Sequence, residues 1–189
     1  MGTNMLQHRD ALQLLQELKP DNHLVQHALA SEAVMRGLAA HLNENVELWG
    51  ITGLLHDLDY PITHANPGQH GMVGAERLTG LLPEEALHAI RAHNGELTGV
   101  KPESVFDHAL RCGETVTGLI SAAALVRPTG IDGMKISSLK KKMKDKAFAA
   151  SVNRDNIRQC EQIGLDLDTF LGIAIASMTA IAADLGLKK

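Results

Sequence analysis

Apolar side chains recur every three or four positions along most of this chain, which is the spacing of one helix face. The pattern predicts helices at 5–19, 21–42, 46–60, 71–82, 83–94, 102–128, 138–150, 153–164 and 167–186. Asp21 or Asn22 is the expected N-cap of the second helix, and the third is expected to stop before Pro61. Since no segment alternates as a strand does, we predict an all-α fold.

The composition narrows the fold and the partners. Aromatic residues make up only 3% of the 189 residues, so the core must consist of Leu, Ala, Ile, Val and Met, which favours helix packing. The length fits one domain, residues 1–189, with a core at about 22–128 and a C-terminal helical cover at about 129–189. The net charge of −4 is too mild for a general nucleic-acid binder, so no specific nucleic-acid binding is expected.

Three features bear on the location of the protein. Its two cysteines, Cys112 and Cys160, have neither metal-binding nor redox spacing, which fits a reducing compartment. The first ten residues lack the apolar core of a signal peptide. No apolar run approaches the roughly 20 residues that span a bilayer. We therefore expect a cytoplasmic protein without membrane contact.

Histidine is unevenly distributed. Nine of the ten histidines lie between His23 and His108, which predicts a ligand-rich first half. On their helices, His27 and His93 share a face with apolar residues and are predicted to point inward. His88 shares its face with two glutamates and an arginine, and is predicted to be solvated.

Acidic residues accompany these histidines. His56 and Asp57 are adjacent where the apolar run GLL meets a loop, and a buried carboxylate there is costly unless a cation neutralises it. The pair therefore predicts a metal site. Glu114 lies on a helix face of small and polar residues, which two interpretations fit: the wall of a polar pocket, or a surface stripe.

The strings HALASEAVMRGLA, LLHDLDYP, HGMVGAERL, AIRAHN and TGLISAAALVRP, in this order, resemble the HD superfamily. The resemblance implies an HD-domain helical bundle and a divalent metal ion. His27, His56 and Asp57 match the first three ligand positions. Glu114 stands at the last ligand position, where the family usually has Asp.

The resemblance also bears on a second metal ion and on the reaction. His70 and His93 match the histidines that hold a second ion in some members, while Asn94 stands where a further histidine often follows. The donors suit iron, manganese, nickel, zinc or magnesium. The implied function is a phosphohydrolase for a small phosphorylated metabolite or nucleotide, with a metal-activated water as the nucleophile. A diiron oxygenase, a non-catalytic metal or ligand sensor, and a homo-oligomer stay open.

Several further residues are candidates for catalysis and substrate binding. Asp57 and Asp59 are the candidate catalytic acids, Asp59 by contact with a metal-bound water or else as an ordinary loop acid. His64, in the loop that follows, is predicted to contact substrate. The candidate phosphate-binding cations, each with solvation as its alternative, are Lys101, Arg127 and Lys135. Residues 135–146 carry six lysines and one acid, which indicates either a phosphate-attracting rim or a solvated helix face.

Overall fold

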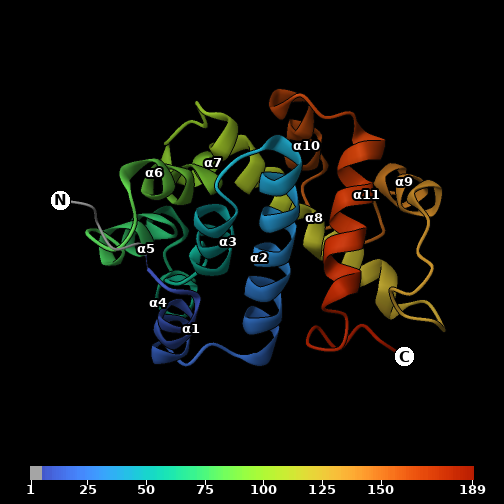
Figure 1. Ribbon diagram of the computed structural model, residues 1–189, viewed down its shortest axis with the longest axis horizontal. Helices are drawn as coiled ribbons and strands as arrows, with labels where there is room; N and C mark the ends of the chain where they lie inside the picture. Colours follow the sequence, from blue (N-terminus) through green and yellow to red (C-terminus); the bar gives the residue numbers. More distant parts are fainter. Residues whose placement is uncertain (1–5) are drawn as a thin grey trace.

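The computed structural model describes residues 6–189, and the regular structure within them is helical (Figure 1). The longer helices are α1 (His8–Glu17), α2 (Asn22–Leu42), α3 (Val46–Leu55), α6 (Glu84–His93), α8 (Val105–Leu125), α9 (Ile136–Lys144) and α11 (Leu167–Ala180). The short ones are α4 (Tyr60–Thr63), η1 (Pro67–Gln69), α5 (Met72–Arg77), α7 (Gly95–Thr98), α10 (Arg154–Arg158) and η2 (Gln159–Ile163). The all-α prediction is confirmed. The start of the predicted first helix and half of the predicted signal-free segment lie in residues 1–5, outside the described residues.

The long helices α2 and α8 contact each other and form the centre of the bundle. Helix α3 packs on α2 and α6 packs on α8, while α11 packs on α2 from the opposite side (Figure 1). Helices α9 and α10 also contact α8. The last third of the chain therefore covers the flank of the two central helices away from α3 and α6, as Figure 1 shows.

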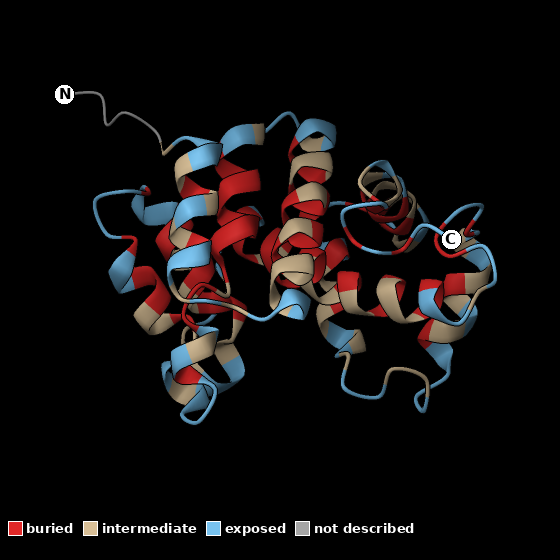
Figure 2. Ribbon diagram, turned by 90° about the horizontal axis from the view of Figure 1, so that it is seen from below, coloured by how far each residue is buried: buried red, intermediate tan, exposed pale blue. Residues whose placement is uncertain are grey.

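After the exposed Glu47 of its first turn, helix α3 has apolar residues on every side, and residues 48–55 are all buried. A glycine allows it to lie close to α2, because a Cβ at Gly53 would stand 2.8 Å from the carbonyl oxygen of Ser31. Figure 2 shows that buried residues concentrate where the helices face one another. The end of α3 therefore delivers the next residues, His56 and Asp57, to the interior of the bundle.

Helix ends agree with the predictions where a side chain caps them. Asp21 accepts a hydrogen bond from the Leu24 amide, so it is the N-cap of α2. The predicted helix 46–60 is wrong in extent, because α3 ends at Leu55 and the chain turns before α4. Pro61 lies in the first turn of α4, where a residue without an amide hydrogen leaves no bond unmade.

No single helix among residues 6–189 is long and apolar enough to cross a membrane. Two consecutive segments, Arg154–Ile163 and Leu167–Ala180, are long and apolar enough only when taken together, and they are bent by 106° relative to each other.

Candidate metal centre

Four histidines surround the carboxylate of Asp57. His27 comes from α2, His56 directly follows α3, His70 follows η1, and His93 ends α6. The carboxylate oxygen Oδ1 of Asp57 lies 3.2 Å from His56 Nε2, 3.1 Å from His70 Nε2 and 3.3 Å from His93 Nε2. Its other oxygen, Oδ2, lies 3.5 Å from His27 Nε2. Helices far apart in the sequence thus bring five candidate ligands to one point.

Carbonyl groups at helix ends fix two of these rings. His56 Nδ1 donates to the Gly53 carbonyl at 2.8 Å, and His93 Nδ1 donates to the Ile90 carbonyl at 2.5 Å. Both acceptors belong to a last helical turn, whose carbonyls have no partner further along the helix. Each bond places the ring proton on Nδ1 and leaves Nε2 with a lone pair when the ring is neutral.

Side chains fix the other two rings. The Thr117 hydroxyl donates to the Glu114 carbonyl at 2.6 Å, so its oxygen accepts the 3.0 Å hydrogen bond from His27 Nδ1. His70 Nδ1 donates to Asp59 Oδ1 at 2.9 Å. Both rings therefore also direct Nε2 toward Asp57.

The Nε2 atoms face one another in two pairs. Those of His27 and His56, the first pair, are 3.2 Å apart, and those of His70 and His93, the second pair, are also 3.2 Å apart. Two facing lone pairs repel unless a proton or a metal cation lies between them. Ligands with bonds of roughly 2.0–2.2 Å to a shared ion lie about 3.0–3.5 Å from one another, which matches both pairs. Each pair thus fits a divalent ion, and Asp57 belongs to both donor sets.

The electrostatics of the metal-free cluster indicate the same need for a cation. Burial alone would raise the pKa of Asp57, but His56, His70 and His93 hold it well below its usual range. Burial lowers the pKa of His56 to about 3. At His70 burial is outweighed by the hydrogen bonds to Asp57 and Asp59, which raise its pKa to about 10. In the absence of metal, a proton on His70 supplies the positive charge.

Glu114 lies beside the first pair. Its Oε2 is 3.7 Å from His27 Nε2, while its Oε1 accepts a hydrogen bond from the Thr115 hydroxyl. Burial raises the pKa of Glu114, against the influence of His27. Within the described chain, Glu114 is not part of either three-residue donor set. Its predicted place next to the cluster agrees with the geometry, and its role as a ligand stays a prediction.

Asp59 has a different position from the predicted one. It is fully buried, and Oδ2 accepts hydrogen bonds from the amides of Gly71 and Gly74 at 2.9 and 2.7 Å, while Oδ1 accepts from His70. With both oxygens engaged, this carboxylate is not placed to contact a metal-bound water. It positions His70 instead, which is neither of the two roles expected from the sequence.

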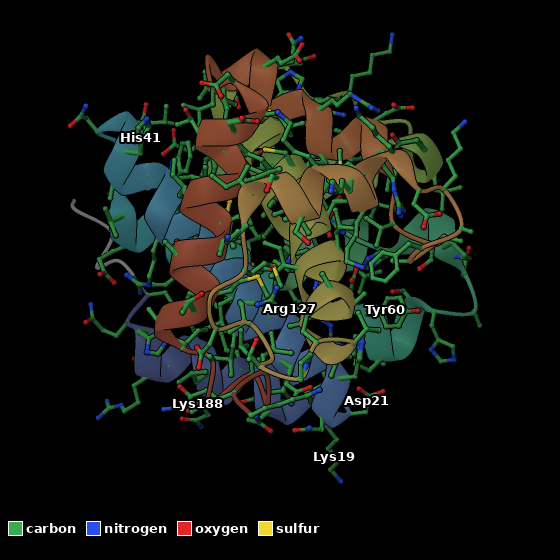
Figure 3. The ribbon with its side chains drawn as sticks, turned by 90° about the vertical axis from the view of Figure 1, so that its right-hand side faces the viewer. Lys19, Asp21, His41, Tyr60, Arg127 and Lys188 are labelled. Carbon is green, nitrogen blue, oxygen red and sulfur yellow. The ribbon has the colours of Figure 1, made fainter. Side chains whose placement is uncertain are left out.

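An open cavity of about 670 Å³ leads to the cluster. Its walls include the candidate ligands His27, Asp57, His70, His93 and Glu114. Two further lining residues, Asp21 and Tyr60, are labelled in Figure 3. No lysine or arginine is among the described residues that line it. The cavity is large enough for a small phosphorylated molecule or a nucleotide.

The four residues predicted to contact substrate, His64, Lys101, Arg127 and Lys135, are not part of this lining, and their roles stay predictions. His64 is exposed and its Nδ1 donates to the Pro61 carbonyl. Lys101 and Lys135 are exposed elsewhere on the surface. Arg127 donates to the carbonyls of Gly130 and Asp132, so it braces the loop after α8. The backbone acceptors that engage Arg127 cannot be identified from sequence spacing.

The structure also shows polar residues that sequence reasoning missed. Arg111 is 2% exposed and donates to the carbonyls of Ala92 and His93, and also to Glu96, Asn156 and Gln159. His88 is partly buried, and its Nδ1 lies 3.0 Å from Asp107, the buried acid of the capping box of α8. The contact depends on Asp107 of the neighbouring helix α8, and the position of His88 on the face of α6 does not reveal it.

The family comparison matches the HD domain over residues 24–144, which is more than half of the chain. The chain belongs to the HD-domain family. It is 31% identical over 103 residues to Ribonuclease Y of Thermosipho melanesiensis, covering 52% of this chain and 20% of that protein. It is 34% identical over 89 residues to Ribonuclease Y of Thermobifida fusca, covering 46% of this chain and 18% of the relative. No solved structure matches the chain.

The chain thus spans about a fifth of the length of these curated relatives. HD domains form a hydrolase-type family whose members bind divalent metals, and this chain has His/Asp groups able to hold such an ion. Family and geometry together support a metal-dependent hydrolase.

Proposed function

We propose that this protein is a metal-dependent phosphohydrolase that acts on a small phosphorylated metabolite or a nucleotide. The observation that carries the proposal is the double donor set, two facing imidazole pairs joined by the carboxylate of Asp57 at the end of an open cavity. Membership in the HD family and similarity to sequences named Ribonuclease Y support hydrolysis of a phosphate ester.

In this proposal His27 and His56 hold one ion, His70 and His93 hold the other, and Asp57 serves both. A divalent ion bound there supplies an activated water and polarises a phosphoryl oxygen. Glu114 adds negative charge beside the first pair. The helix-end carbonyls and Asp59 keep the imidazoles in place, so that little reorganisation accompanies the reaction.

The cavity also bears on the substrate. Because its described lining holds no lysine or arginine, the charge of the reacting phosphate has to be balanced by the bound cations. The walls offer neutral hydrogen-bonding groups, among them Asn153 and Asn156, which suit sugar hydroxyls or other uncharged parts of a substrate.

The test begins with the metal content of the purified protein, measured by mass spectrometry. Hydrolysis of bis-p-nitrophenyl phosphate, p-nitrophenyl phosphate and nucleoside monophosphates is then assayed with that metal, after its removal by EDTA, and after its return. Turnover that is lost with EDTA and restored by the metal supports the proposal. Tightly bound iron with oxygen consumption selects the diiron oxygenase, and metal binding without turnover on any of these esters selects the sensor.

A further inference from the structure

A second cavity, of about 640 Å³, adjoins the first, and both are lined by Val152 and Asn153. Its charged lining residues are Lys144, Lys146, Arg154, Arg158 and Asp155. Four cations against one acid give this lining a net charge of +3. We call it the basic cavity. It therefore contrasts with the metal cavity, whose charged wall residues, apart from histidines, are carboxylates.

The wall between the two cavities is a loop that the hydrogen bonds of Arg154 hold in place. The guanidinium of Arg154 donates to the carbonyls of Ala149 and Val152 at 2.6 Å each, and also to those of Asp145 and Phe148. Its Nε is buried and has no partner among the described residues. Arg154 thus holds residues 145–152 in a curl around its own side chain.

The remaining cations of the basic cavity are available to a ligand. Within residues 6–189, Lys144 and Lys146 make no hydrogen bond or ion pair, and Arg158 pairs only with the exposed Asp155 at 3.2 Å. Neighbouring lysines are engaged differently, because Lys140 pairs with Asp168 and Lys142 lies over the ring of Phe148. Three cations therefore surround a hollow next to the metal centre.

We infer that the basic cavity binds a second phosphate of the substrate while the first phosphate lies at the metal centre. The inference rests on the proposed phosphohydrolase function and narrows it to substrates with at least two phosphates. A nucleoside bisphosphate and a short single-stranded oligonucleotide share this chemistry. The basic cavity lies almost wholly beyond residue 144, where the HD match ends, so the family comparison does not assign it.

The test compares thymidine 3′,5′-bisphosphate with thymidine 5′-monophosphate on the metal-loaded protein, by kcat/KM and by calorimetric binding. The parent should prefer the bisphosphate by about tenfold or more, since hydrogen bonds to charged groups are worth that much. A triple variant, Lys144→Ala, Lys146→Ala and Arg158→Ala, should lose that preference and keep its affinity for the monophosphate. Arg154 is left intact because it braces the loop.

The matched control removes three cations that line neither cavity, by Arg9→Ala, Arg77→Ala and Lys188→Ala. Arg9 has an adjacent acidic partner, Asp10, as Arg158 has Asp155. The control should keep the preference of the parent. A parent without preference, or a first triple variant that keeps it, overturns the inference. If neither thymidine compound is hydrolysed, the proposed function fails on these substrates, while the binding ratio still decides the basic cavity.

A further arm distinguishes the two sources of the second phosphate. Binding of a thymidine tetranucleotide that exceeds binding of the bisphosphate in the parent, and falls in the first triple variant alone, identifies the oligonucleotide as the better ligand. Equal or weaker binding, with the same response to the variants, identifies the bisphosphate. An oligonucleotide affinity that drops equally in both triple variants reflects overall charge and counts against the basic cavity.

Discussion

The two histidine pairs of the metal centre differ in what holds them. In the first pair, His27 lies within the long helix α2 and His56 directly follows the buried stretch 48–55 of α3. In the second pair, His93 ends a helix, but His70 follows the short η1 in a connecting segment. Packing therefore places the first pair, whereas polar contacts place half of the second.

Asp59 makes the polar contacts that hold His70 of the second pair, and the conformation of Gly71 allows them. Asp59 bonds His70 and the amides of Gly71 and Gly74. Gly71 has a φ of 87°, and a Cβ there would stand 2.7 Å from the Ile90 carbonyl oxygen. The comparison teaches that a rigid core and a single buried carboxylate achieve the same ligand geometry, and that each pair can be disturbed separately.

The largest expected effect comes from Asp57, because both pairs share it. Asp57→Ala should abolish binding of both ions and lower kcat/KM on the order of 10³-fold, since metal catalysis contributes several kcal/mol. Metal analysis and a phosphate-ester assay measure this, and circular dichroism should show a retained helical fold. Asp132→Ala, at an exposed position, is the control. Full metal occupancy in Asp57→Ala would show that this carboxylate is not a ligand.

The next largest effect is a difference between the two pairs in how their metal affinity depends on pH. An ion entering the second pair must displace the proton of His70, whose pKa is raised to about 10 by Asp57 and Asp59 despite burial. Its affinity should therefore rise by about tenfold per unit between about pH 7 and 9. His56, with a pKa lowered to about 3 by burial, is already neutral, so the first ion should depend less on pH. Manganese titrations by calorimetry test this, and two equal slopes would contradict it.

The metal-free protein should show the corresponding effect on stability. The raised pKa of His70 stabilises the fold fully below its ordinary value of 6.5, and this contribution is lost as the pH rises through about 10. In EDTA, the midpoint temperature of thermal unfolding should therefore fall as the pH rises from 6.5 to about 10.

A smaller effect is expected from the partners of the rings. Asp59→Asn should lower the affinity of the second pair for its ion by about 10–100-fold and leave the first ion bound. Residues that bond a metal ligand typically contribute that much to metal affinity. Thr117→Val is the matched change, since Thr117 bonds His27 of the first pair. Thr117→Val should lower the affinity of the first pair for its ion and leave the second ion bound. Loss of both ions in either variant would mean that the pairs are not independent.

The smallest effect concerns Glu114, whose Oε2 lies 3.7 Å from His27 of the first pair. Glu114→Gln removes the charge at nearly constant shape and should weaken the first ion by about tenfold or less. Glu114→Asp should retain the ion, because Asp is the usual residue at this position in the resembling family. Calorimetry on the two variants measures this, and equal affinity in Glu114→Gln and the parent would leave Glu114 as a wall residue only.

The sequence was sufficient where local chemistry decides the outcome. Helical periodicity and caps such as Asp21 predicted most elements, and helix phase with the family strings predicted the approach of His27, His56 and Asp57. The C-terminal i−3 carbonyls that fix His56 and His93 also follow from local rules.

The remaining features depend on contacts between distant segments. The partner of His88 lies 19 positions away, and Asp59 accepts from amides 12 and 15 positions ahead. The hydrogen bonds of Arg127 could not be predicted because its acceptors are loop carbonyls, whose direction depends on the backbone path and not on residue type. Phase on one helix contains no information about either.

Arg111 sets the smallest piece of this chain that can be excised. Its guanidinium, buried between the end of α6 and the C-terminal cover, needs Asn156 and Gln159 as acceptors. A polypeptide trimmed to the family match, residues 24–144, would lose both acceptors and also the cavity wall at 151–156. A guanidinium left with too few partners is a severe defect. The folded unit is therefore larger than the matched region, and the segment after residue 144 supplies part of the wall of the cavity that leads to the histidines.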